Sequence, residues 1–101
     1  MGDRMSVTVV LEFQTQPDKV DAVKEFFRKL LPDTRAYDGF ESLTVHQNQE
    51  DPTAFLVWEL WATRQRYEAY LAWRTETGAL NDLVAMLTGP PSFRFFDFVG
   101  V

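Results

Sequence analysis

The sequence predicts an α+β domain in which helices cover one face of a single antiparallel sheet. Segments of alternating apolar residues are separated by two stretches with apolar residues at helical spacing. The turn-rich residues 48–53 join two of the strand segments as a hairpin. The full order is β-α-β-β-α-α-β, which is the ferredoxin-like split βαβ arrangement.

The first half of the chain supplies the opening strand and helix. Residues 7–14 alternate apolar and more polar side chains, which predicts a strand with one buried face. Thr15 is predicted to cap a following helix, with Pro17 in its first turn. Apolar residues then recur at helical spacing until Pro32, which we expect to end or kink that helix.

The second half supplies three strands and two helices. Residues 40–47 and 55–61 are predicted strands, and Thr63 is predicted to cap the helix after them. Thr77 is expected to cap a short helix that stops before Gly89-Pro90-Pro91. A last strand is predicted over residues 93–99.

Length and composition indicate one globular domain. We expect residues 1–101 to form it, with residues 1–6 as a flexible N-terminus. The net charge of −5, without a Lys/Arg cluster, argues against nucleic acid and anionic membranes as partners. The absence of cysteine excludes disulfides but does not fix the compartment. The sequence shows no signal peptide or transmembrane run, so we expect a cytoplasmic protein. A single histidine without cysteine predicts no transition-metal site.

Apolar residues remain on the face of the sheet that the helices cannot cover. Packing against the sheet of a second copy is the simplest way to bury them, which predicts a homodimer. The four aromatic rings between residues 93 and 99 are likewise expected to be buried, with help from the partner. Further pairing of dimers stays open.

The candidate site combines one strand and the helix that follows it. Glu59 and Trp61 are two residues apart, so they share one strand face. Tyr67, Tyr70 and Arg74 share one helix face. Because the connecting turn is short, we predict that the two faces meet across a cavity on the helix side of the sheet.

Three residues are candidate catalytic bases. Burial would raise the pKa of Glu59 toward neutrality, although Glu59 could instead pair with Arg74 or Arg35. His46 is the only imidazole and could otherwise be exposed. Tyr70 could act as a base or cap the core.

Four residues are candidate contacts to a small aromatic ligand. Trp61, Tyr67 and Arg74 would bind it from the strand and the helix. Packing and ion pairing are the alternative roles for these side chains. Trp73 lies off the main helix face, where it could contact a ligand, the next helix or a partner subunit.

Several segments, in this order, carry a resemblance to a known family. They are residues 31–40 (Leu-Pro-Asp-Thr-Arg-Ala-Tyr-Asp-Gly-Phe), Asp51-Pro52, Glu59-Leu-Trp61 before a helix, and Leu87-Thr-Gly89-Pro90. Together they resemble the antibiotic biosynthesis monooxygenase family of the dimeric α+β barrel superfamily. The resemblance implies a homodimeric barrel with a cavity in each subunit. It also implies oxidation of phenols, quinols or polycyclic aromatic rings by dioxygen without metal, flavin or other cofactor.

One position departs from the family pattern. Many members carry histidine on the second helix where this chain has Tyr70. A phenol is mostly protonated at neutral pH, unlike an imidazole. Two hypotheses therefore follow: a cofactor-independent monooxygenase, or a non-catalytic small-ligand-binding or stress-related dimeric barrel protein. A haem-binding relative is a further alternative.

Overall fold

Four strands and three α-helices make up the computed structural model, which describes residues 6–101. The strands are β1 (Val7–Gln14), β2 (Phe40–Gln47), β3 (Ala54–Trp61) and β4 (Ser92–Asp97). The helices are α1 (Val20–Arg35), α2 (Arg64–Glu76) and α3 (Ala79–Val84), and a 3-10 turn, Pro17–Lys19, precedes α1.

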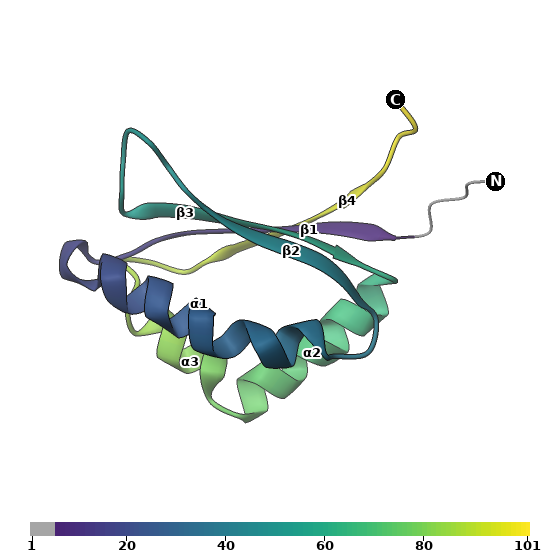
Figure 1. The fold of residues 1–101 in the computed structure, drawn as a ribbon, viewed down its shortest axis with the longest axis horizontal. Coiled ribbons are helices and arrows are strands. Elements are labelled where there is room, and N and C mark those ends of the chain that lie inside the picture. The colour runs from purple at the N-terminus through teal and green to yellow at the C-terminus, as the bar shows by residue number, and fades with distance from the viewer. Residues whose placement is uncertain (1–5) are drawn as a thin grey trace.

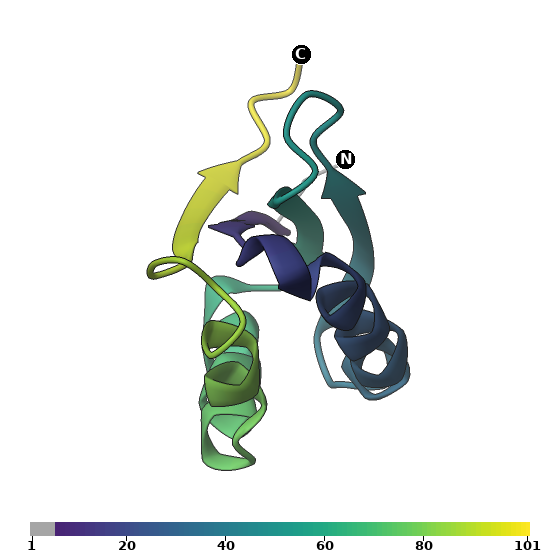
Figure 2. The same cartoon turned by 90° about the vertical axis from the view of Figure 1, so that its left-hand side faces the viewer.

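The strands form one sheet in the order β2-β3-β1-β4, with every neighbouring pair antiparallel. All three helices lie on the same side of the sheet (Figure 1). Turned by 90°, the molecule shows α1 on one side and α2 with α3 on the other, both beneath the sheet (Figure 2). The predicted α+β, ferredoxin-like fold is confirmed.

The core lies between the sheet and the helices. Alternate residues of β1 and β3 face the helices and are buried, including Val9, Val57 and Trp61. One cluster joins the middle of these strands to α1 and α3. A second cluster is aromatic and surrounds Trp61 near the start of α2. The period-two pattern of the sequence therefore predicted the buried face of β1, and the two-residue spacing of Glu59 and Trp61 predicted the helix-facing side of β3.

One predicted feature of the first helix is wrong, and one of the two outcomes expected at Pro32 does not occur. Thr15 is not a helix cap: it is buried, and its amide donates to the Thr53 carbonyl at 2.8 Å. Pro32 does not end α1, which continues to Arg35. Pro32 removes one amide donor near the end of the helix. Hydrogen bonds from Thr34 to the Tyr70 and Arg74 side chains of α2 hold the last turn of α1, which follows Pro32.

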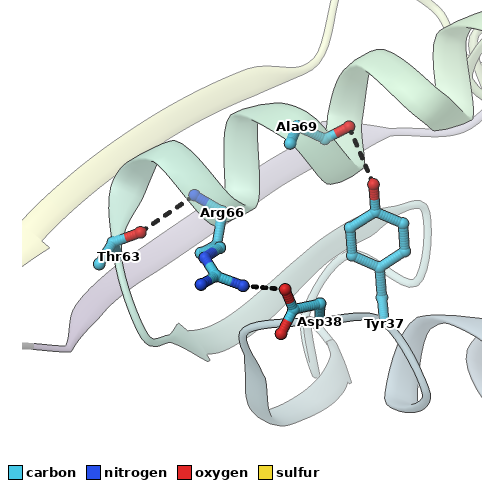
Figure 3. Close-up of polar contacts among 5 residues, drawn as sticks. All are labelled: Tyr37, Asp38, Thr63, Arg66 and Ala69. Carbon is cyan, nitrogen blue, oxygen red and sulfur yellow. Dashed lines mark hydrogen bonds and ion pairs between the residues drawn. The ribbon is translucent and has the colours of Figure 1, made fainter.

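Of the two predicted caps in the second half, one is confirmed and one is wrong. Thr63 accepts a hydrogen bond from the Arg66 amide at 3.1 Å and caps α2 (Figure 3). Thr77 instead ends α2, and Gly78 precedes α3 with a φ of +86°. The reversal between the helices is too tight for a threonine cap, because it needs a residue that tolerates positive φ.

The loop between α1 and β2 is attached to the start of α2. Asp38 forms an ion pair with Arg66, and the Tyr37 hydroxyl donates to the Ala69 carbonyl at 3.4 Å (Figure 3). The Gly39 carbonyl accepts from the Ala62 amide at 2.7 Å. These contacts fix the loop against the strand-helix turn that carries the candidate site.

The other face of the sheet carries no helix and leaves apolar side chains exposed. Trp58 on β3 is 49% exposed and Phe96 on β4 is 44% exposed. Within one chain, residues 93–99 are therefore only partly buried, less than the sequence predicts. Phe93 and Phe95 are half-buried because they face the helices.

At the N-terminus, the expected flexible segment lies outside the described residues except for Ser6. The Ser6 hydroxyl donates to Glu41 at 2.6 Å. Among residues 6–101, no helix is long and apolar enough to cross a bilayer. The same residues contain no group of acidic, histidine or cysteine side chains placed to hold a metal ion.

Candidate functional site

A cavity of about 50 Å³ lies between the sheet, α1, and the pair α2–α3. Its walls are mostly aliphatic and aromatic. Four polar side chains line it, and all four are sequence candidates: Glu59, Tyr67, Tyr70 and Arg74. The strand face and the helix face predicted to meet do line one space on the helix side of the sheet.

Glu59 brings a carboxyl group into this apolar space. It is 3% exposed, and the Trp61 indole N–H donates to its Oε1 at 2.9 Å. Burial raises the pKa of Glu59 to about 7, and the hydrogen bond from Trp61 opposes that rise. Among residues 6–101, Glu59 forms no ion pair, so the alternative pairing with Arg74 or Arg35 is not present. The group can therefore exchange a proton near neutral pH.

Tyr67 contributes a phenol to the cavity lining, and the residue is 1% exposed. Its ring packs edge-on against Trp61 at 5.5 Å between centroids and against Phe95 at 5.8 Å. Burial raises the pKa of Tyr67, and the nearby Glu59 and Tyr70 raise it further. Its hydroxyl makes no hydrogen bond to any described residue. Tyr67 can therefore donate a hydrogen bond to a ligand, but it cannot serve as a base near neutral pH.

Tyr70 and Arg74 belong to a buried hydrogen-bond network that links α2 to α1. Arg74 donates from Nε to the Tyr70 hydroxyl at 3.0 Å. Its Nη2 donates to the Thr34 hydroxyl and to the Leu30 carbonyl, each at 3.0 Å. The Thr34 and Tyr70 hydroxyls are 2.7 Å apart. The Tyr70 oxygen thus has two partners within the protein, which suits a positioning role better than proton abstraction.

Three sequence candidates lie outside the cavity lining. His46 is exposed on the open face of the sheet, with its Nε2 2.8 Å from the Thr44 hydroxyl. Trp61 is fully buried and directs its N–H to Glu59. Trp73 stacks on the Tyr37 ring at 5.3 Å and lies under the Arg74 guanidinium. The structure therefore brings four of the seven candidates together, and Trp61 forms a hydrogen bond to one of them, Glu59.

The family model described as antibiotic biosynthesis monooxygenase matches residues 6–76, which include β1 through α2. The chain belongs to the antibiotic biosynthesis monooxygenase family. The matched region contains Glu59, Tyr67, Tyr70 and Arg74. A search of curated proteins returned no match.

Solved structures share the fold of this antibiotic biosynthesis monooxygenase domain. A crystal structure of an antibiotic biosynthesis monooxygenase superposes with a TM-score of 0.83 at 22% identity, covering 92% of this chain and 98% of the other. A conserved protein from Methanosarcina mazei Go1 superposes at 0.84 with 18% identity, covering 92% of each chain. SnoaB from Streptomyces nogalater, a cofactor-independent oxygenase solved as a mutant, superposes at 0.83 with 15% identity over 96% of each chain. At these identities the likeness shows the fold alone.

Thr34 is the site residue that the sequence reasoning missed. It is fully buried at the end of α1, and it joins the network of Tyr70 and Arg74. A signal was present, because Thr34 continues the apolar stripe of Val23 and Phe27 at helical spacing. A polar side chain on such a buried stripe needs a hydrogen-bond partner inside the protein. Thr34 could therefore have been assigned to a buried polar network of this antibiotic biosynthesis monooxygenase domain.

Proposed function

We propose that this protein is a cofactor-independent monooxygenase that oxidises a small phenol, quinol or polycyclic aromatic ring with dioxygen. The observation that carries the proposal is the buried carboxyl of Glu59, whose pKa of about 7 suits a general base. It lies in an apolar cavity beside the phenol of Tyr67. The family and the fold shared with a cofactor-independent oxygenase give further support.

The first step is proton abstraction. The Glu59 carboxylate takes the proton from a substrate phenol or from the acidic carbon beside a carbonyl group. The Trp61 indole N–H holds the carboxyl in position from behind. Tyr67 stays protonated and donates a hydrogen bond to the substrate oxygen that becomes negative. The apolar walls keep water away from the resulting carbanion.

The second step is oxygen transfer, with the substrate as the source of electrons. The carbanion gives one electron to dioxygen, and the resulting radical and superoxide combine into a carbon–oxygen bond. Protonated Glu59 returns its proton to the peroxide. Loss of a proton from the same carbon then forms C=O, breaks the O–O bond and releases water. A CH₂ group becomes C=O in a four-electron oxidation that matches the reduction of dioxygen to one carbonyl oxygen and one water.

The substrate must widen the cavity in order to bind. A space of about 50 Å³ holds a few water molecules but not an aromatic ring. Three half-buried apolar side chains line it from opposite helices: Phe26 on α1, Leu71 on α2 and Leu80 near the start of α3. Movement of these side chains opens a path between the helices without disturbing the sheet.

Oxygen uptake in the presence of an anthrone or a naphthoquinol tests the proposal. Because the base must be ionised, the rate should rise with pH and level off above about pH 7. Oxygen-electrode measurements with and without protein, corrected for spontaneous oxidation, give the profile. Uptake that equals the protein-free rate at every pH would exclude the activity and leave the ligand-binding alternative. A catalysed rate that is flat between about pH 5 and 9 would exclude Glu59 as the base.

We also propose that the open face of the sheet is covered by a second copy of the chain. The half-exposed Trp58 and Phe96 on that face support the proposal. A stable interface of this kind buries about 2,000 Å² or more in total. Replacing Trp58 by glutamate should produce a monomer, because the carboxylate would have to be buried in the interface.

Sedimentation velocity measures this change in association state. Ala72→Glu, on the exposed side of α2, adds the same charge away from the sheet and should leave the dimer intact. A wild-type protein that sediments as a monomer at micromolar concentration would contradict the proposal. A dimeric Trp58→Glu variant would place the interface elsewhere.

A further inference from the structure

Arg74 places a permanent positive charge beside the cavity. The residue is 8% exposed and carries a cationic guanidinium. All of its hydrogen-bond acceptors are neutral: the Tyr70 hydroxyl, the Thr34 hydroxyl and the Leu30 carbonyl. Its guanidinium carbon lies 4.4 Å from the centroid of the Trp73 ring, which is also neutral.

No carboxylate of residues 6–101 balances that charge. Arg74 takes part in none of the ion pairs formed by these residues, which all lie at the surface. Glu59 is the only acidic side chain that lines the cavity, and it accepts its hydrogen bond from Trp61. With a pKa of about 7, Glu59 also carries only part of a negative charge at neutral pH. The cavity therefore has an excess of positive charge.

One nitrogen of the guanidinium has no hydrogen-bond partner among the described residues. Nε and Nη2 are used within the protein, whereas Nη1 donates to no described residue. Nη1 is not sealed from solvent either, since no fully buried side-chain nitrogen among the described residues lacks a hydrogen-bond partner. Buried cations are stable when an anion with good geometry meets them.

We propose that the cavity binds an aromatic anion, whose carboxylate or phenolate oxygen pairs with the Arg74 guanidinium while its ring fills the apolar space. The rest of the lining fits a flat ring, because it includes Phe27, Leu83 and Phe93. The inference rests on the cavity being the substrate site proposed above. It names the charge of the substrate, which the oxygenase proposal leaves open.

The alternative is that Arg74 only ties α2 to α1 through Leu30 and Thr34. A comparison of benzoate with benzamide separates the two roles, because these ligands have nearly the same size and shape and differ in charge. Neither is oxidised by the proposed chemistry, so their binding does not depend on oxygenase activity. Titration calorimetry of the 101-residue chain measures both affinities.

If Arg74 binds an anion, wild-type protein should bind benzoate more tightly than benzamide by about tenfold or more, the scale of one charge-assisted hydrogen bond. Arg74→Lys should keep part of that preference. Arg74→Met and Arg74→Gln should lose it while still binding benzamide. The glutamine variant retains a hydrogen-bond donor, which provides a neutral variant if the methionine variant does not fold.

Three results would overturn the proposal: equal binding of the two ligands by wild-type protein, no binding of benzoate, or a preference for benzoate that survives in the folded neutral variants. A nitrophenol titrated below and above its own pKa then distinguishes the two oxygen sources. Tighter binding only of the ionised form would show that a phenolate is accepted in place of a carboxylate. Absence of oxygen uptake alongside benzoate selectivity would refute the oxygenase and leave the anion site standing.

Discussion

Replacing Glu59 by glutamine is expected to lower the rate of oxygen uptake with a quinol or anthrone by about a hundredfold or more. The amide has nearly the same shape as the carboxyl, and its side-chain oxygen can still accept the Trp61 N–H, but it cannot take a proton from the substrate. Steady-state uptake at saturating substrate measures the effect. Glu76→Gln, at the exposed end of α2, serves as the matched control.

The same variant should also change how stability depends on pH. The pKa of Glu59 is about 7 in the folded protein and 4.5 in its ordinary state, so the folded state holds the proton more tightly. Wild-type stability should therefore fall as pH rises from about 4.5 to 7, by about 3 kcal/mol from this group. Glu59→Gln should lack this fall, as measured by urea unfolding across the range. A variant that loses activity but follows the wild-type stability profile would show that Glu59 does not titrate as described.

Replacing Gly39 by alanine should strongly destabilise the protein, by about 2 kcal/mol or more. Gly39 has a φ of +91°, where a β-carbon adds strain. A β-carbon there would also lie 2.6 Å from the Arg66 β-carbon and 2.8 Å from its γ-carbon. The clash would push α2 away from the loop to which Asp38 and Tyr37 attach it.

Gly78→Ala is the matched control for this change. Gly78 has a similar φ of +86°, but nothing lies within 4 Å of the position of its added β-carbon. It should therefore show the cost of backbone strain alone, about 1 kcal/mol. The difference between the two variants in urea unfolding isolates the contact with Arg66. Equal losses would mean that the loop and α2 adjust to each other freely.

The pairing of the strand and helix faces could be predicted from the sequence because it depends on short-range geometry. Two-residue alternation puts Glu59 and Trp61 on the same face, and helical spacing does the same for Tyr67, Tyr70 and Arg74. The intervening turn of Ala62 and Thr63 leaves little freedom between the two elements. All of these except Trp61 line the cavity.

The roles of the two tyrosines could not be predicted in the same way. Whether the hydroxyl of a buried tyrosine has a hydrogen-bond partner depends on which polar groups approach it from distant parts of the chain. Tyr70 contacts Thr34, which lies 36 residues earlier, whereas Tyr67 meets the rings of Trp61 and Phe95. The sequence indicated two phenols on one helix face, but only the folded chain distinguishes the donor from the positioning residue.

The two capping errors have different causes. Thr15 and Thr77 each precede a helix in the sequence, which is the usual position of a cap. A long-range contact engages Thr15, which lies opposite Leu87 in an isolated β-bridge. The Thr77 hydroxyl instead donates to the Arg74 carbonyl within α2, and Gly78 takes the position before α3. Thr63 has no such competing contact with a distant strand, and there the local rule holds.

The position of β1 in the sheet has a consequence for how the chain is made. β1 lies between β3 and β4, and its first residue, Val7, is opposite Asp97. Its neighbour on one side, β4, is therefore synthesised after all of the other strands. During translation, the ribosome tunnel still holds β4 when β1, β2 and β3 are already free, so one side of β1 remains an unpaired edge. The nascent three-stranded intermediate exposes this edge to aggregation, and the sheet is completed only when β4 has left the tunnel.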